Sequence, residues 1–211
     1  MAKIEWTKIS NLNLAKAVRE AGYDISIFDH YSQVTKEEAK KSSIKQILSV
    51  ISDEFDQKTS RNIKQIEKGV YVICISKPFV IQYEKGRSKV IYIGQGKVLS
   101  RLKSHFERSL FRFMRSLAGT NFDLYISEPK KSGGGVAKLY YKHIEFLLLE
   151  RFSQKFGGKE GAERFPLLNN NAGSKKNLQP DDGWKLPLSM RGEKRRWVLS
   201  KTDNWDFEEL G

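Results

Sequence analysis

The hydrophobic positions in the middle of the chain predict two short strands followed at once by a helix. The runs from Gly69 to Ile73 and from Val90 to Gly94 are rich in β-branched and aromatic residues. Such runs, bounded by Gly, Pro and charged residues, are typical of paired β-strands. From about Lys97 to Leu117, leucine and phenylalanine recur at helical spacing, which predicts a helix with a wide apolar face.

The opposite face of this helix is strongly basic. Like charges three or four residues apart on a helix repel one another by a few tenths of a kcal/mol per pair, and a polyanion would compensate for that repulsion. We therefore expect Arg108, Arg112 and Arg115 to contact phosphates, although a solvated charged face is the alternative. At about 100° per residue the stripe is roughly 80° wide, and it consists of Arg101, His105, Arg108, Arg112 and Arg115.

Two further elements complete the expected core. Residues Phe122 to Ser127 alternate enough to predict a third strand, and a helix is expected from about Val136 to Phe156. The fold class is therefore predicted to be α+β, with a small core at residues 67–172. Its three-stranded, mainly antiparallel sheet would be flanked by helices.

The regions on either side of this core are expected to be extensions. Residues 1–66 are interpreted as a helical appendage, with a helix opened by a capping box at Thr35. The apolar stripe of that helix would pack on the core or on a second copy of the chain in a homodimer. Residues 173–211 are interpreted as an irregular extension that is basic and contains tryptophan.

Composition favours a polyanionic partner. The 211 residues include 38 Lys and Arg against 25 Asp and Glu, a formal net charge of +13. Nucleic acid is the first expectation and an anionic membrane surface the second. The single cysteine, Cys74, excludes a disulfide framework and a cysteine-based zinc site. No run of apolar residues is long enough for a signal peptide or a membrane span, so we expect a soluble, cytoplasmic protein.

One acidic residue is placed unusually. Glu145 lies among large apolar residues on almost every side of the predicted helix. A buried, unpaired carboxylate is costly and is kept when it binds a cation or is hydrogen-bonded. The structural alternative is an ion pair with an arginine of the core. Glu150, beside Arg151 at the end of the apolar run, is expected at the surface.

The triplets Gly69-Val70-Tyr71 and Tyr92-Ile93-Gly94, followed by Arg101 and His105 on the next helix, resemble the motifs of the GIY-YIG nuclease family. The resemblance covers about half of the chain. It implies a metal-dependent endonuclease, of restriction type, acting on double-stranded DNA. Glu145 would hold Mg²⁺ or Mn²⁺. The asparagine that closes the family core matches Asn169 best, with Asn170 and Asn171 as alternatives.

The resemblance also implies roles for the other residues. Arg101 would pair with the non-bridging phosphate oxygens, Tyr71 would activate the attacking water, and Tyr92 would share that task or orient the water. His105 would hydrogen-bond the tyrosine or act as the base itself. Lys97 is expected to contact nucleic acid, and its field, with that of Arg101 and His105, would help to stabilise a phenolate. The choice between Tyr71 and His105 as base stays open.

Two alternatives to a restriction-type enzyme remain at this point. One is a structure-specific repair or mobile-element nuclease, and the other is a non-catalytic nucleic-acid-binding protein that keeps the fold. Beyond the core, Arg195 and Arg196 are interleaved with tryptophan. This pattern suits nucleic-acid contact and suits an amphipathic flap packed on the core equally well.

Overall fold

A computed structural model describes residues 3–170 and 173–200 of the chain, and its centre is a four-stranded antiparallel sheet. The strand order is β1-β6-β2-β5. The strands are β1 (Thr7–Asn13), β2 (Gly69–Ile75), β5 (Val90–Gly96) and β6 (Asn121–Ser127). The two strands and the third strand expected from the hydrophobic pattern are thus confirmed, and so is the α+β class.

Strand β2 lies in the interior of the sheet, between β6 and β5. Every one of its residues is buried, which explains its nearly continuous apolar sequence. Its cross-strand partners include Gly94 opposite Tyr71 and Tyr92 opposite Ile73. Because side chains alternate between the faces of a strand, Tyr71, Ile73, Tyr92 and Gly94 belong to one face of the sheet.

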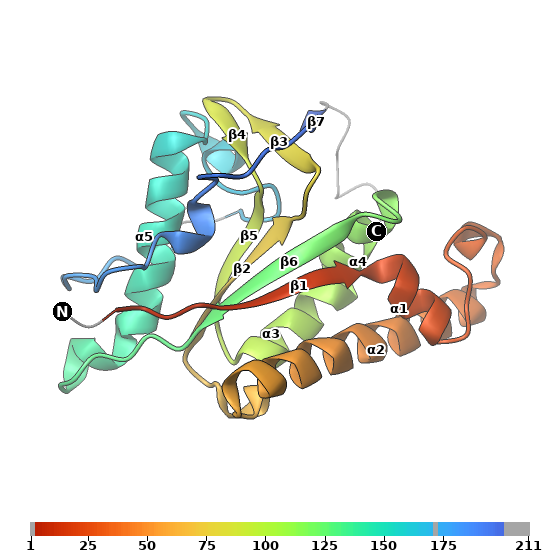
Figure 1. Ribbon diagram of the computed structural model, residues 1–211, viewed down its shortest axis with the longest axis horizontal. Helices are drawn as coiled ribbons and strands as arrows, with labels where there is room; N and C mark the ends of the chain where they lie inside the picture. The colour runs from red at the N-terminus through yellow and green to blue at the C-terminus, as the bar shows by residue number, and fades with distance from the viewer. Residues whose placement is uncertain (1–2, 171–172, 201–211) are drawn as a thin grey trace.

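Helices cover the two faces of this sheet. Helix α5 (Tyr140–Lys155) lies on one side of the strands, and α2 (Gln33–Thr59), α3 (Val98–His105) and α4 (Phe111–Ser116) lie on the other (Figure 1). Both α3 and α5 pack against β2 and β5. Since β5 is an edge strand, side chains of α3 and α5 can meet beyond it.

The N-terminal region differs from the expected helical appendage. Its strand β1 pairs antiparallel with β6, so the sheet has four strands where three were expected. A short helix, α1 (Leu14–Glu20), follows β1. Helix α2 begins at Gln33 with Ser32 as its N-cap, so the predicted cap at Thr35 is wrong. The apolar stripe of α2, with Ile47 and Ile51 at its centre, is buried in the core of this same chain.

The basic helix predicted from Lys97 to Leu117 is present with one change. A π-helical turn, Phe106–Leu110, separates α3 from α4. A π-turn closes its hydrogen bonds over one more residue than an α-turn. Residues after it are therefore rotated about the helix axis relative to the regular stripe that was expected.

The long connection between β2 and β5 is not an irregular loop. It contains β3 (Phe79–Tyr83) and β4 (Gly86–Ser88), which form a second small sheet in the order β4-β3-β7. Strand β7 (Trp197–Ser200) comes from the C-terminal extension and pairs parallel with β3. This extension is thus joined to the core by backbone hydrogen bonds as far as Ser200.

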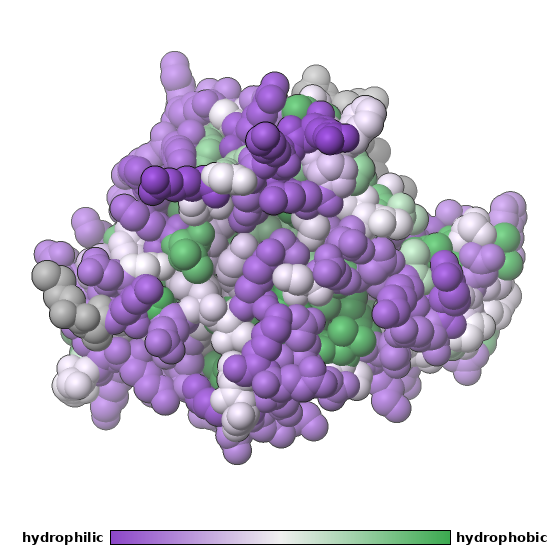
Figure 2. Space-filling view, viewed as in Figure 1, coloured by the Kyte–Doolittle hydropathy of each residue, from purple (hydrophilic) through white to green (hydrophobic). Residues whose placement is uncertain are grey.

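The surface is hydrophilic, as expected for a chain with many charged residues. The face shown in Figure 2 is largely hydrophilic, with small and separated hydrophobic patches. Within residues 3–170 and 173–200, none of the helices combines the length and the apolar character needed to cross a bilayer.

Candidate active site

Two tyrosines lie side by side on the β2–β5 pair, and a glycine makes room for them. The rings of Tyr71 and Tyr92 are stacked with centroids 5.9 Å apart. A Cβ atom at Gly94 would lie 2.6 Å from the Tyr71 hydroxyl and 2.6 Å from Cε1 of Tyr92. No real side chain tolerates contacts this short, so Gly94 is required if both rings are to occupy this place.

The Tyr71 hydroxyl is buried and has no hydrogen-bond partner. Burial raises the pKa of Tyr71 well above 10, and the nearby Tyr92 raises it further, while the Arg101 guanidinium lowers it in part. Burial likewise raises the pKa of Tyr92. Both phenols are therefore neutral at neutral pH.

His105, at the end of α3, lies against both rings, and we call Tyr71, Tyr92 and His105 the tyrosine cluster. The ring centroid of His105 is 4.3 Å from that of Tyr92 and 6.2 Å from that of Tyr71. Nε2 of His105 is buried without a hydrogen-bond partner. Burial, with the positive charges of Arg101 and Arg108, lowers the pKa of His105 to about 4, so the imidazole is neutral and free to accept a proton.

Arg101 extends from α3 over the end of β5. Its Cγ lies 3.6 Å from where a Cβ atom of Gly96 would be, which is an ordinary contact, and glycine is favoured at position 96 by its φ of 114°. Arg101 is exposed and has no ion pair within 4 Å among the residues that the structure describes. Its charge lowers the pKa values of Tyr71, Tyr92 and Glu145 against the effect of burial. The guanidinium is thus close to all three groups and available to an anion.

Glu145 approaches the same point from α5. Burial raises the pKa of its carboxyl to about 7, against the opposing charges of Arg101 and Lys142. Over the described ranges, no hydrogen bond or ion pair to Glu145 is found, so the expected structural alternative, a paired carboxylate, is absent there. A partly buried carboxylate without a partner suits a divalent cation, which would offset its desolvation.

A metal ion here would depend on one protein carboxylate. Within residues 3–170 and 173–200, no three His, Cys, Asp or Glu side chains come together as a metal-binding group. Mg²⁺ commonly binds through one or two carboxylates and completes its shell with water and substrate phosphate. The donor set at Glu145 therefore fits Mg²⁺ or Mn²⁺ and does not fit a fully protein-enclosed ion.

Asn169 holds the second motif in place. Its side-chain amide donates to the Ile93 carbonyl (2.7 Å) and its side-chain oxygen accepts from the Ile93 amide (2.8 Å). The side chain is buried and both of its polar atoms are engaged, so Asn169 positions the Tyr92-Ile93-Gly94 backbone and is not free to touch substrate. Asn170 is exposed, and Asn171 lies outside the described residues.

The predicted phosphate-contacting residues of the basic helix fall into separate groups. Arg108 is exposed, and Lys97 is exposed with an ion pair to Glu67 at 3.2 Å. Arg112 is half-buried. Arg115 makes an ion pair with Asp29 at 2.6 Å and lies over the Phe28 ring, so a phosphate contact by Arg115 would have to replace this ion pair.

The two arginines predicted in the C-terminal extension also differ from each other. The side chain of Arg195 is 4% exposed and pairs with Glu193, so little of it is accessible to the nucleic acid that it was predicted to contact. Its guanidinium also donates to the carbonyls of Ile75 and Phe79. Arg196 is exposed.

One charged neighbour of the site, Lys142, was not predicted from the motifs. It lies one turn before Glu145 on α5 and lowers the pKa of that carboxyl. Residues three positions apart share a helix face, so this spacing could have been recognised once Glu145 was singled out.

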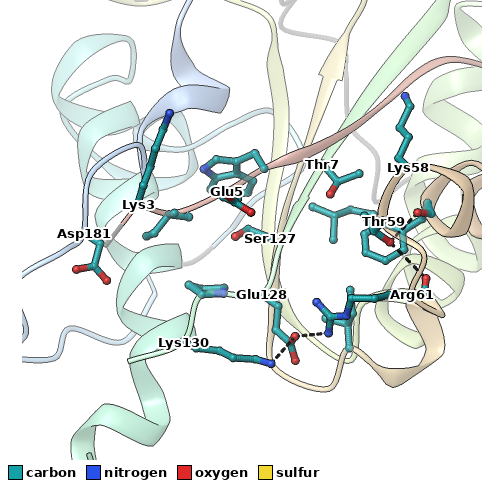
Figure 3. A pocket seen from close by; sticks show the side chains of 16 residues that line it. Lys3, Glu5, Thr7, Lys58, Thr59, Arg61, Ser127, Glu128, Lys130 and Asp181 are labelled. Carbon is teal, nitrogen blue, oxygen red and sulfur yellow. Dashed lines mark hydrogen bonds and ion pairs between the residues drawn. The ribbon is translucent and has the colours of Figure 1, made fainter. Parts of the chain in front are cut away.

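A separate groove of about 650 Å³ lies between the N-terminal segment, the end of α2 and the end of β6 (Figure 3). Arg61 and Lys130 both pair with Glu128 there, at 2.6 and 3.1 Å. The single carboxylate of Glu128 thus offsets one of these two positive charges. The groove contains none of the residues of the tyrosine cluster.

Comparisons of the chain with models of protein families, with curated proteins and with solved structures found no match.

Proposed function

We propose that this chain is a metal-dependent endonuclease of the GIY-YIG type that hydrolyses DNA phosphodiester bonds. One observation supports the proposal above all. Five side chains from β2, β5, α3 and α5 converge at one edge of the sheet: Tyr71, Tyr92, Arg101, His105 and Glu145. The group combines an exposed guanidinium, an unpaired carboxylate and neutral proton acceptors, which are the components that phosphodiester hydrolysis requires.

Glu145 and Arg101 would divide the electrostatic work. Glu145 would hold Mg²⁺ or Mn²⁺, and a bound cation of this kind neutralises charge on the phosphate and polarises water. The exposed Arg101 guanidinium would pair with the non-bridging oxygens and stabilise the charge that develops in the transition state.

The proton of the attacking water has two candidate acceptors. His105 is neutral at pH 7 and can accept directly, but with a pKa of about 4 it is a weak base. A Tyr71 phenolate would be a strong base, yet the phenol has a pKa well above 10 and ionises only if added positive charge lowers that pKa. Their ring centroids are 6.2 Å apart, and neither the Tyr71 hydroxyl nor Nε2 of His105 has a hydrogen-bond partner, so each is a separate candidate.

A restriction-type enzyme acting on duplex DNA is the form that we propose. Strands β1 and β7 are both paired with strands of the core, and this supports a compact enzyme in the part of the chain that the structure describes. The experiment is incubation of the protein with supercoiled plasmid and Mg²⁺, followed by electrophoresis and mapping of the ends.

The outcome of that experiment separates the alternatives. Discrete fragments with unique ends support the restriction type, whereas cutting confined to branched or nicked DNA supports a structure-specific nuclease. Retarded but uncut plasmid would contradict the catalytic proposal and indicate a binding protein.

A further inference from the structure

An exposed tryptophan stands on the edge strand of the small sheet. Trp197 is 61% exposed, and it is followed by Val198, which is 39% exposed. Burial of a large apolar side chain stabilises a folded protein, so a tryptophan left largely in water gives up that gain. Among residues 3–170 and 173–200, strand β7, which carries it, pairs with β3 on one side and with no strand on the other.

The segment that carries Trp197 is nevertheless firmly attached. Glu193 pairs with Lys89 at 2.5 Å and with Arg195 at 2.6 Å. Lys89 is only 2% exposed, and Arg195 also donates to the Ile75 carbonyl at 3.0 Å. We call Lys89, Glu193 and Arg195 the buried clasp. Removing one partner of a buried ion pair is strongly destabilising, so the clasp holds β7 on the core while Trp197 faces outward.

The surroundings of Trp197 are basic. Lys194 and Arg196 precede it in the chain. Lys77 belongs to the same region, because the carbonyl of the next residue, Pro78, accepts hydrogen bonds from the backbone amides of Arg196 and Trp197. All three cations are exposed. Neither residues 194–200 nor residues 76–83 contain an acidic residue. We define Lys77, Lys194, Arg196 and Trp197 as the Trp197 surface.

We propose that the Trp197 surface binds a nucleic-acid strand, with the cations on phosphates and the indole stacked on a base. Such alternation of cations and exposed aromatic residues suits a nucleic-acid strand because each base offers a stacking face and each nucleotide one charge. A protein partner of ordinary composition would leave this concentration of like charge uncompensated.

The Trp197 surface is connected to the candidate active site through strand β2. The clasp contacts β2 at Ile75, four residues along the strand from Tyr71. At about 3.3 Å per residue these two backbone positions of β2 are about 13 Å apart. The inference rests on the proposed function only in that both require a nucleic acid as partner.

The test separates stacking from charge with two variants. With EDTA present to remove divalent cations, fluorescence anisotropy measures the affinity for a labelled single-stranded oligonucleotide and its duplex over a range of salt concentrations. Trp197→Ala should weaken single-strand binding by roughly 5- to 150-fold with an unchanged salt slope. Arg196→Gln should reduce that slope by about 0.7.

Two remote substitutions serve as matched controls. Val34 is 74% exposed and Lys41 is exposed on α2, so Val34→Ala and Lys41→Gln should leave affinity and slope unchanged. Wild-type affinity in Trp197→Ala would overturn the inference. The inference would also be overturned if the wild type sedimented as a dimer and Trp197→Ala as a monomer, with unchanged DNA affinity. The Trp197 surface would then be a contact between two copies of the chain.

The inference and the proposed function fail in distinguishable ways. If the wild-type protein cleaves plasmid while Trp197→Ala binds normally, the nuclease proposal stands and the stacking surface is wrong. If the wild-type protein never cleaves but Trp197→Ala loses affinity, the surface stands and the catalytic proposal is wrong.

Discussion

The side chain of Asn169 closes two hydrogen bonds on Ile93, one to its amide at 2.8 Å and one to its carbonyl at 2.7 Å. Strand β5 is an edge strand, so without Asn169 these backbone groups would lack a partner on that side. Ile93 lies between Tyr92, a member of the tyrosine cluster, and Gly94, which makes room for its rings. The asparagine therefore acts on the site through the backbone that carries it.

We predict that Asn169→Ala destabilises the fold and weakens cleavage. Leaving buried backbone groups unpaired costs about 1–3 kcal/mol each, so the free energy of unfolding should fall by roughly 2 kcal/mol or more. Denaturant titration measures this loss. The neighbouring Asn170 is exposed, and Asn170→Ala should change neither stability nor rate. Equal effects of the two substitutions would contradict the proposed role of Asn169.

A second prediction concerns the pH dependence of stability. Because the pKa of Glu145 is about 7 in the folded chain, against an ordinary value of 4.5 for a glutamate side chain, the folded state retains a proton that the unfolded state has lost. Stability should therefore fall as pH rises from about 4.5 to about 7. Glu145→Gln should remove this fall and stabilise the fold by up to about 3 kcal/mol above pH 7.

Thermal unfolding of Glu145→Gln and of Glu150→Gln across this pH range provides the comparison. Glu150 is exposed, so its substitution should leave the pH profile of the wild type. Mg²⁺ should stabilise the wild type and not Glu145→Gln. A profile that Glu145→Gln leaves unaltered would show that this carboxyl does not titrate as described.

A third prediction separates two arginines of the same helical segment. Arg108 is exposed, whereas Arg115 is engaged with Asp29 and Phe28. Arg108→Ala should reduce the slope of DNA affinity against salt by about one, and Arg115→Ala should change the slope little. Filter binding at several salt concentrations measures both slopes. The reverse order would show that Arg115 leaves Asp29 to contact phosphate.

A fourth prediction concerns the group that accepts the proton. If the Tyr71 hydroxyl takes it, Tyr71→Phe should lower the single-turnover rate by roughly 10²–10⁴-fold, the usual contribution of a general base. Because that hydroxyl is buried without a partner, its removal should not destabilise the fold. By contrast, Tyr83→Phe should destabilise it, since the Tyr83 hydroxyl donates to the Val90 carbonyl at 2.6 Å.

His105→Ala, made in parallel, tests the rival base. A mild effect of Tyr71→Phe beside a severe loss in His105→Ala would assign the base role to the imidazole. Near-native rates in both variants would exclude the cluster as the source of the base.

The parts of the fold that could be predicted are those whose pattern is local. The apolar runs of β2, β5 and β6 and the periodicity of α5 are visible over short windows, and these elements are where the pattern places them. Strand β1 was missed because its residues Thr7–Asn13 mix polar and apolar positions. Its identity depends on pairing with β6, more than a hundred residues away.

The candidate site shows the same division. Tyr71, Tyr92, Arg101, His105 and Glu145 were identified from motifs and spacing, and the structure brings them together. The roles of three other residues could not be predicted, because each depends on contacts that the sequence pattern does not reveal. Arg115 pairs with Asp29, and Asn169 is hydrogen-bonded to Ile93. Arg195 pairs with Glu193 and donates to the Ile75 carbonyl. The contacts of Arg195 explain why part of the basic run next to Trp197 attaches the C-terminal extension to the core.

The most direct test of the nuclease proposal is the single-turnover rate of DNA cleavage by Glu145→Gln in saturating Mg²⁺, compared with the wild type. The account predicts that the wild type cleaves and that the variant, although folded and able to bind DNA, loses cleavage by at least about 10³-fold, since its metal ligand is gone. Cleavage at the wild-type rate by Glu145→Gln would contradict the central claim.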